Sequence, residues 1–334
     1  MSFLRTLVNS SVIVHPPGFY IIGFQSFASA NVFFIFLAFV YVVTVLFNGL
    51  LIIIVVINPS LHTPKFLAVI NLAVVDLCFT TCTIPGMIKT FLFKVNFVPF
   101  NSCLVQMYFY YVFAPLESYA LMILAYDRLV AICFALRHNS INTIRSMCCI
   151  ISITWCYNLG ATAYSVSLMT RLSFCNSVTV FSYFCDYAPV YRLACNDNSM
   201  QWFAGTFFSY LNILVPLSFI VVSYISILLT VFKMKTNRVK TLATCAEHII
   251  LVAVFYIPFF VIYTLGFYLG PVNPDLRVLC LSLASCLPPC INPIVYSLKT
   301  KEIKTRALAL IRQSKRSVPT NSERIIVVKI KTAV

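Results

Sequence analysis

The chain has 334 residues, of which 60% are hydrophobic and only 10% are charged, and its mean hydropathy is +0.93. Soluble globular chains are about 45–50% apolar and about 25% charged, so this composition excludes an ordinary soluble domain and predicts a polytopic membrane protein. The net charge of +15 could suit a nucleic-acid-binding protein, but the bases cluster between and after apolar segments and form no basic stripe with exposed aromatics.

Residues 1–30 precede the first long apolar segment and contain one N-glycosylation sequon, at Asn9. They hold no basic stretch followed by an apolar run and a small-residue cleavage site, so we predict no removable signal peptide. The first apolar segment would then act as its own insertion signal.

Seven apolar segments follow, each long enough for the about 20 residues that a helix needs to cross a bilayer. They cover residues 31–57, 66–92, 103–134, 146–169, 202–232, 240–268 and 277–298. Because lipid offers the backbone no hydrogen-bond partners, each segment must be helical, and the expected fold is an all-α seven-transmembrane helix bundle. Five prolines inside these segments predict kinks: Pro85, Pro115, Pro216, Pro258 and Pro293.

The distribution of basic residues predicts the orientation of the bundle. Six of the 24 Lys and Arg residues lie on the side of the N-terminus, and the other 18 lie on the opposite side, ten of them after residue 298. Since basic residues concentrate in cytoplasmic loops, we expect a multi-pass plasma-membrane protein with its N-terminus outside and its C-terminus in the cytoplasm.

The chain therefore divides into an extracellular segment 1–30, a helix bundle 31–298 and a cytoplasmic tail 299–334. In the first part of the tail, residues 299–313, bases alternate with apolar residues. This pattern predicts a short amphipathic helix lying on the cytoplasmic leaflet, and the alternative is a partly ordered basic tail.

Four of the 14 cysteines are expected on the outer side of the membrane. Cys103 begins the third segment, and Cys175, Cys185 and Cys195 lie ten residues apart in the long outer loop 170–201. An oxidising compartment permits two disulfides, and the spacing alone leaves all three pairings open.

Charged residues inside the apolar segments mark candidate functional positions. Asp127 and Arg128 stand side by side near the cytoplasmic end of the third segment, a costly arrangement unless the two groups satisfy each other or face a polar cavity. The alternative for Arg128 is an anchor that reaches the lipid headgroups. Asp76 and Glu117 are two further acids at mid-membrane depth, where an isolated carboxylate is strongly destabilising.

Five stretches resemble the olfactory receptor branch of the rhodopsin-like (class A) G-protein-coupled receptors, over about residues 18–312. They are Leu61-His62-Thr63-Pro64 with Asp76-Leu77-Cys78, Ala125-Tyr126-Asp127-Arg128 with Ala131-Ile132-Cys133, the three loop cysteines, Lys240-Thr241 through His248, and Pro289 with Asn292-Pro293-Ile294-Val295-Tyr296. The sequence departs from the motifs of this family at Lys65-Phe66-Leu67, Leu129 and Glu247, which indicates a divergent member. The resemblance implies the disulfides Cys103–Cys185 and Cys175–Cys195.

The resemblance also implies a signalling mechanism. Agonist would move the sixth helix outward and free Arg128, restrained by Asp127 in the silent receptor, to face a heterotrimeric G protein. The implied switch residues are Asp127, Arg128, Tyr224, Asn292, Pro293 and Tyr296. Asn48, Asp76 and Glu117 would form a polar hub that shares protons or waters or holds a sodium ion, and two neutral hydrogen-bonded acids are the alternative.

The expected ligand site is the outer half of the bundle, where aromatic residues dominate. Small-molecule pockets are mostly apolar with a few placed polar groups, although for any single aromatic simple helix packing is the better explanation. The candidate residues are Tyr110, Tyr111, Ala114, Phe208, Asn212, Tyr256, Phe259, Phe260, Tyr263 and Ser282. The third segment lacks an acid in its outer part, which argues against a simple amine ligand.

The function expected from the sequence is that of an odorant receptor that couples to an olfactory-type stimulatory G protein and raises cyclic AMP, without enzymatic activity or a cofactor. A class A receptor for another small ligand is the closest alternative. A transporter or channel would need paired repeats, which the sequence lacks. A membrane enzyme would need a catalytic cluster, and the four histidines lie at termini, loops or segment ends.

Overall fold

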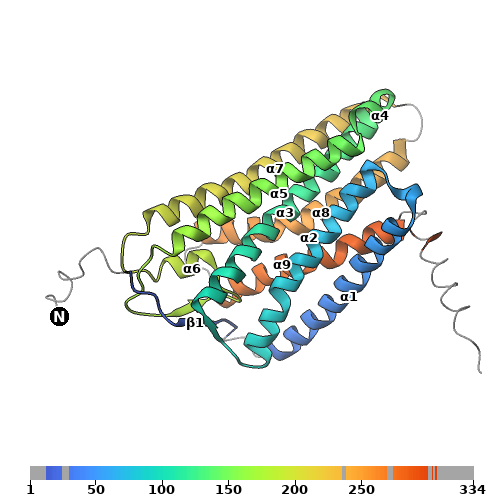
Figure 1. Ribbon diagram of the computed structural model, residues 1–334. Helices are drawn as coiled ribbons and strands as arrows, with labels where there is room; N and C mark the ends of the chain where they lie inside the picture. The colour runs from blue at the N-terminus through green and yellow to red at the C-terminus, as the bar shows by residue number, and fades with distance from the viewer. Residues whose placement is uncertain are drawn as a thin grey trace, which may run out of the picture.

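The computed structural model describes residues 13–24, 30–234, 238–268, 274–299, 303 and 305–306, together with most of their side chains. Seven long helices run alongside one another in this part of the chain (Figure 1). They are α1 (Ala30–Ile57), α2 (Pro64–Met87), α3 (Phe100–Cys133), α5 (Ile144–Met169), α7 (Ser199–Lys233), α8 (Arg238–Tyr268) and α9 (Pro274–Lys299). Their bounds fall within a few residues of the seven predicted segments.

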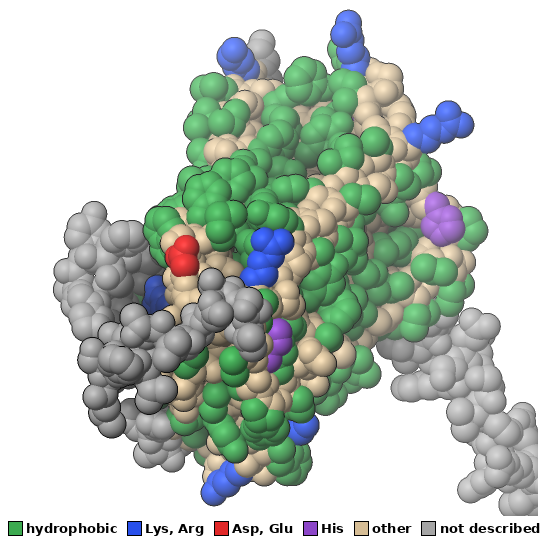
Figure 2. Space-filling view, turned by 60° about the vertical axis from the view of Figure 1, so that its left-hand side comes forward, with side chains coloured by type: hydrophobic (Ala, Val, Ile, Leu, Met, Phe, Trp, Pro, Cys, Tyr) green, Lys and Arg blue, Asp and Glu red, His purple; other side chains and the backbone are tan. Residues whose placement is uncertain are grey.

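Hydropathy and length identify five of the described helices as candidate membrane spans, or six if α3 is joined with the bent turn that follows it. The helix that fails this test is α5, whose sequence includes Arg145, Asn158 and several Ser, Thr and Cys residues. It is nevertheless 26 residues long, about 39 Å at 1.5 Å per residue, and lies in the bundle beside α3 and α7. Figure 2 shows hydrophobic side chains over most of the visible surface, as a lipid-facing protein requires.

Local sequence signals account for several helix boundaries. Helix α2 begins at Pro64, a residue suited to the first helical turn because it has no N–H to leave unpaired. Helix α5 begins with a capping box in which Thr143 and Ser146 each accept a hydrogen bond from the other's backbone N–H. The five prolines at which we expect kinks all lie inside helices. Pro85, the one in α2, is followed by a π-helical turn at Ile88–Leu92.

Helix α3 is the centre of the bundle and packs against α2, α5, α7 and α8. One buried apolar cluster joins α1, α2, α3, α7 and α8 in one half of the bundle. A second cluster lies under the loop segment between α5 and α7. Ile303, beyond α9, is helical and is buried in the first cluster. The rest of the predicted amphipathic helix lies almost entirely outside the described residues, as do Asn9 and the C-terminal tail.

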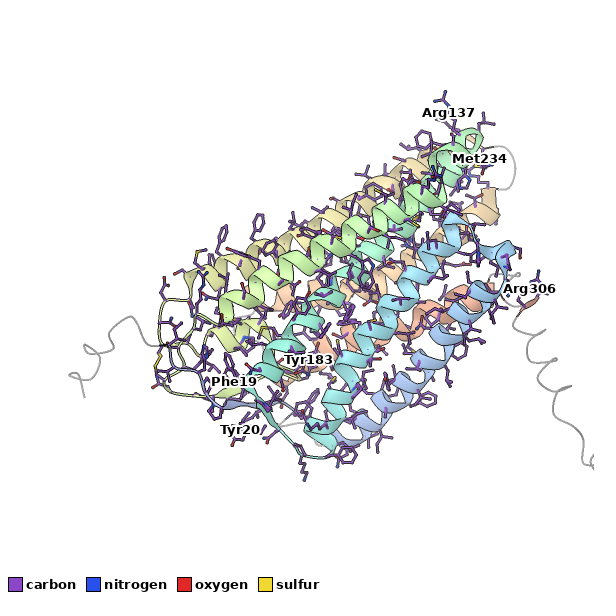
Figure 3. The ribbon with its side chains drawn as sticks, viewed as in Figure 1. Phe19, Tyr20, Arg137, Tyr183, Met234 and Arg306 are labelled. Atoms are coloured by element: carbon purple, nitrogen blue, oxygen red, sulfur yellow. A yellow bond between two sulfur atoms is a disulfide. The ribbon has the colours of Figure 1, made fainter. Side chains whose placement is uncertain are left out.

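A small three-stranded sheet, which the sequence analysis did not predict, closes one end of the bundle. Strand β1 (Gly18–Ile22) lies between β2 (Phe97–Pro99), with which it is antiparallel, and β3 (Thr179–Phe181), with which it is parallel. Phe19 and Ile21 of β1 point into the cluster beneath. We call this end the sheet end and the opposite one the tail end; Figure 3 labels Phe19 and Tyr183 at the former and Arg137 and Arg306 at the latter.

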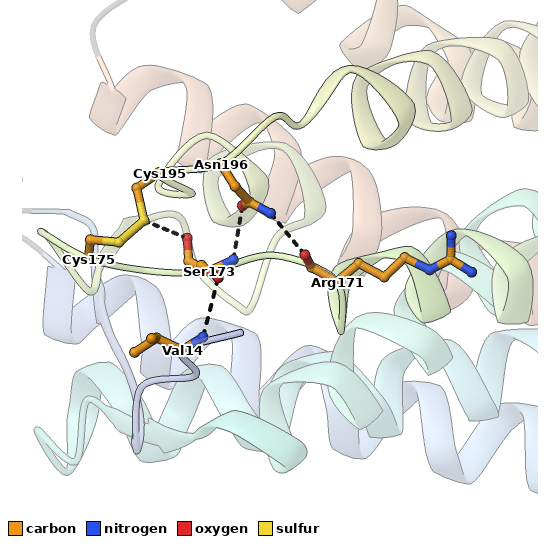
Figure 4. The surroundings of a disulfide bond; sticks show 6 residues. All are labelled: Val14, Arg171, Ser173, Cys175, Cys195 and Asn196. Carbon is orange, nitrogen blue, oxygen red and sulfur yellow. Dashed lines mark hydrogen bonds between the residues drawn. A yellow bond between two sulfur atoms is a disulfide. The ribbon is translucent and has the colours of Figure 1, made fainter. Parts of the chain in front are cut away.

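Two disulfides hold the loop between α5 and α7 at the sheet end. Cys103, in the first turn of α3, is bonded to Cys185, and Cys175 is bonded to Cys195. This is the pairing that the family resemblance implies. Around the second disulfide, the Ser173 N–H donates to Asn196 Oδ1 at 2.9 Å, and the Val14 N–H donates to Ser173 Oγ at 3.2 Å (Figure 4). The N-terminal segment and the loop are therefore bound together.

Candidate functional site

A cavity of about 550 Å³ lies in the half of the bundle nearest the sheet end. Its walls come from α3, α5, α7 and α8, with one residue from α9, and its roof comes from the loop that Cys185 ties to α3. This size falls within the about 300–1,000 Å³ that is usual for small-molecule sites. Aromatic side chains form much of the lining, so the cavity suits a compact and largely apolar molecule.

Six of the ten predicted ligand residues line this cavity: Tyr110, Tyr111, Ala114, Phe208, Asn212 and Tyr256. Helical periodicity brings the first three together, because residues three and four apart share one face of α3. The side chains of Phe259 and Tyr263 lie outside the described part of the structure.

Phe260 and Ser282 are described but do not line this cavity. Phe260 is one turn beyond Tyr256 and about 40° further round α8, so its ring is 46% exposed on the outer surface. Ser282 is fully buried, and its hydroxyl donates to the Leu279 carbonyl of its own helix. Helix α9 instead contributes the adjacent Leu281 to the cavity.

The roof contains residues that the sequence analysis missed. Phe184, Asp186, Tyr187, Tyr191 and Arg192 line the cavity, and all but Phe184 belong to or flank the short helix α6 (Tyr187–Tyr191). One signal could have identified them: a bridge from Cys103 to Cys185 must bring the neighbours of Cys185 over the start of α3.

Asp186 is a buried carboxylate in this roof. The Tyr111 hydroxyl donates to its Oδ1 at 2.6 Å, and the Ser182 hydroxyl donates to its Oδ2 at 3.4 Å. The bond from Tyr111 is short, and the contact from Ser182 is near the upper limit of hydrogen-bond length. They attach the roof to α3 beside the disulfide.

Tyr187 attaches the roof to α5 and α7. Its hydroxyl lies 3.4 Å from the Ser165 carbonyl and 3.2 Å from the Gln201 carbonyl, and its ring lies against Gly205, where a Cβ would come within 2.9 Å of Cε1. Burial raises the pKa of the Tyr187 phenol, so at neutral pH it stays a hydrogen-bond donor. The absence of a side chain at Gly205 is what lets the ring approach α7.

The floor of the cavity is a polar junction of three helices. Ser118 of α3 donates to the Asn212 carbonyl of α7 at 3.3 Å, and the Tyr256 hydroxyl of α8 lies 2.5 Å from Ser118 Oγ. Since Ser118 has one proton, Tyr256 is the donor in the shorter bond. Asn212 Oδ1 is buried and has no hydrogen-bond partner among the described residues. A ligand that reaches this floor therefore touches three helices at once.

A second junction joins the roof to α9. The hydroxyls of Tyr110, Tyr183 and Ser285 form a closed buried triangle, with oxygen–oxygen distances of 2.7, 3.1 and 2.8 Å. Tyr110 belongs to α3, Tyr183 to the loop and Ser285 to α9. Any displacement of α3 relative to α9 must break or rearrange this triangle.

The predicted polar hub lies between the cavity and the tail end. Asn292 Nδ2 donates to both Asp76 oxygens, at 3.1 and 3.2 Å, and Asn48 Nδ2 donates to the Pro289 carbonyl at 3.0 Å. Glu117 is fully buried, and neither of its oxygens has a hydrogen-bond partner in the described part of the chain. The described residues contain no cluster of three or more His, Cys, Asp or Glu side chains that could hold a metal ion.

At the tail end, Asp127 accepts a hydrogen bond from Asn142 Nδ2 at 2.7 Å, and the described residues show no ion pair between Asp127 and Arg128. Tyr224 of α7 and His248 of α8 are joined by a bond of 2.6 Å between the phenol oxygen and Nδ1. Pro293 lies inside α9, and the Tyr296 side chain lies outside the described part. His248 is a further candidate for the switch, which the sequence analysis named only as the end of the motif that begins at Lys240.

Comparison with known proteins gives one consistent match. The model of a family described as "Olfactory receptor" matches residues 37–314. Rat "Olfactory receptor 1496" is 32% identical over 84% of this chain and 91% of its own length. Human "Olfactory receptor 2AT4" is 30% identical over 92% of this chain and 97% of its own length, and rat "Olfactory receptor-like protein I9" is 33% identical over 81% and 86%.

Proposed function

The chain belongs to the olfactory receptor family, and on that basis we propose that it binds a small odorant in the cavity at the sheet end and activates a stimulatory G protein of the olfactory type, raising cyclic AMP. The observation that carries the ligand site is the cavity itself, which has an aromatic lining and a roof tied by a disulfide to α3. Family membership alone indicates a multi-pass seven-helix membrane receptor with a small-molecule ligand.

We infer that the sheet end faces outside, where an odorant can enter the cavity, and that the tail end faces the cytoplasm. At the tail end Leu136 is completely exposed beside the exposed Arg137, in the turn between α3 and α5. A fully exposed leucine is a natural contact for a protein partner. Together with residues 137–145 and the bases at 233–240, it would frame the G-protein surface.

The packing of α8 suggests how a ligand signals. Helix α8 packs closely against α9 but only lightly against α3 and α7. Two hydrogen bonds in the described part link it to them: Tyr256 with Ser118 at the cavity floor and His248 with Tyr224 near the tail end. A ligand that binds more tightly when Tyr256 has moved would favour the state in which α8 lies further outward. It can shift the equilibrium between the two states by no more than its difference in affinity for them.

The test is the cyclic-AMP response of cells that co-express the receptor and the olfactory-type stimulatory G protein, across a mixed odorant panel. We expect a ligand response that Arg128→Ala abolishes when surface expression is matched. Tyr256→Phe removes the floor hydrogen bond, keeps the ring, and should shift the half-maximal odorant concentration about tenfold. A verified surface receptor that answers no odorant with any G protein would reject the proposal.

A further inference from the structure

We propose that a groove between α2 and α3 at the sheet end binds one glycerophospholipid, with the phosphate at its polar end and an acyl chain along its apolar end. The groove has a volume of about 440 Å³ and shares no lining residue with the odorant cavity. It opens on the side of the bundle, and this inference does not depend on the proposed function.

The polar end of the groove is rich in hydrogen-bond donors. Lys89 and Thr90 come from the π-helical turn after α2, and Asn101, Ser102 and Gln106 come from the first turns of α3. In the described part of the chain, none of their side-chain donors has a protein partner. Among these described side chains, Gln106 makes a hydrogen bond through Oε1, which accepts from the Cys185 N–H at 3.3 Å and leaves the Nε2 amide free to donate.

Charge complementarity selects the occupant. The groove lining includes the cationic Lys89 and no Asp or Glu. A phosphodiester is an anion whose oxygens only accept hydrogen bonds, so it matches a set of donors around one ammonium group. A sterol offers a single hydroxyl and would leave most of these donors unpaired.

The apolar end of the groove continues into the bilayer. Val105 and Phe109 lie one turn apart on α3, and both are exposed. Phe109 is about 12 Å further along the helix axis than Asn101. Its ring stacks on Phe113, with 6.0 Å between centroids, and Phe113 in turn contacts Trp155 of α5. This aromatic surface gives an acyl chain a continuous path toward the middle of the membrane.

Gly86 keeps the groove open on the α2 side. A Cβ at this position would lie 2.9 Å from Gln106 Nε2, so a larger side chain would displace one of the donors and fill the space. Gly86 and Lys89 are about one helical turn apart and both line the groove. They provide two independent ways to remove the site, one by charge and one by volume.

The experiment is native mass spectrometry of the purified full-length receptor in detergent, titrated separately with dioleoylphosphatidylglycerol, dioleoylphosphatidylcholine and cholesterol. We expect one tightly retained copy of either phospholipid. Lys89→Gln should weaken its binding about tenfold through the loss of a charge-assisted hydrogen bond. The matched control is Lys94→Gln, because Lys94 is an exposed lysine nearby that does not line the groove.

Gly86→Leu keeps Lys89 and should abolish binding of the retained phospholipid by filling the groove. This variant therefore tests the proposal even if Lys89→Gln fails to fold. The unfolding temperature of each variant is measured in parallel. Unchanged phospholipid binding in Lys89→Gln or Gly86→Leu would overturn the proposal. Displacement of the phospholipid by cholesterol, or an equal loss of binding in Lys94→Gln, would overturn it as well.

Discussion

Asp127 and Arg128 are neighbours in the chain, yet the described structure shows no ion pair between them. Adjacent residues on a helix point about 100° apart, so their side chains do not face each other. Asp127 instead faces Asn142, in the short stretch that leads from α4 (His138–Ile141) into α5. The bond ties the end of α3 to the loop that follows it, so the restraint at this site passes through Asn142.

Asn142→Ala is therefore expected to destabilise the receptor. The substitution leaves the Asp127 carboxylate, which is only 6% exposed, without its side-chain donor. The loss of a donor to a buried charged acceptor costs about 1–3 kcal/mol, which should lower the unfolding temperature of the purified receptor by several degrees. Asn139→Ala is the control, because Asn139 is exposed and its side chain bonds, among the described residues, only the adjacent His138. Equal shifts in the two variants would contradict this account.

Glu117 gives a second prediction at the scale of one residue. Its two buried oxygens have no hydrogen-bond partner in the described structure, and this suits them to accept a cation together with Asp76. We expect sodium chloride in place of choline chloride to raise the unfolding temperature by about 2–4 °C, which corresponds to about 1 kcal/mol of ion binding. Glu117→Gln should lose this sodium response. A sodium effect of the same size in wild type and variant would show that the ion acts elsewhere.

Strand β1 decides how the sheet end is closed. It brings residues near the N-terminus between the segment before α3 and the loop after α5, three stretches that are far apart in the sequence. The close approach depends on Gly18, where a Cβ would lie 2.3 Å from the Val98 carbonyl oxygen. Because that atom belongs to the backbone, a side chain at residue 18 can be accommodated only if the strands separate.

Gly18→Ala should consequently loosen the sheet. We expect faster hydrogen exchange at the Tyr20 and Ile21 amides, which donate to Val178 and Asn96, and a lower unfolding temperature. Gly49→Ala is the same chemical change in the middle of α1, where a Cβ would meet nothing within 4 Å. It should leave stability unchanged or raise it by up to about 1 kcal/mol. Unaltered exchange in Gly18→Ala would show that β1 tolerates the contact.

The orientation of the whole molecule is a prediction from charge alone. With 18 of the 24 basic residues on the side of the C-terminus, the N-terminus should lie outside. An epitope tag placed before residue 1 should bind antibody on intact cells, and a tag after residue 334 should bind only after permeabilisation. Asn9→Gln should remove a glycan and increase electrophoretic mobility. Labelling of the C-terminal tag on intact cells would reverse the assignment.

The sequence alone predicted the seven-helix architecture and the family, and both are confirmed. The physical reason is local: a bilayer requires about 20 apolar residues in a helix, so composition identifies each span without knowledge of its neighbours. The motifs around Asp127 and Asn292 are contiguous in the chain, so they can also be recognised from the sequence alone. Helical periodicity also places Tyr110, Tyr111 and Ala114 on one face of α3, where they line the cavity.

Only the tertiary structure decided which groups meet. The roof of the cavity, the Tyr110–Tyr183–Ser285 triangle and the place of β1 all join segments from distant parts of the chain. Local sequence cannot specify these contacts, because the angle at which helices cross and the path of a loop depend on packing across the whole bundle. The same packing turned Phe260 toward the outside and buried Ser282, although both lie on the expected helices.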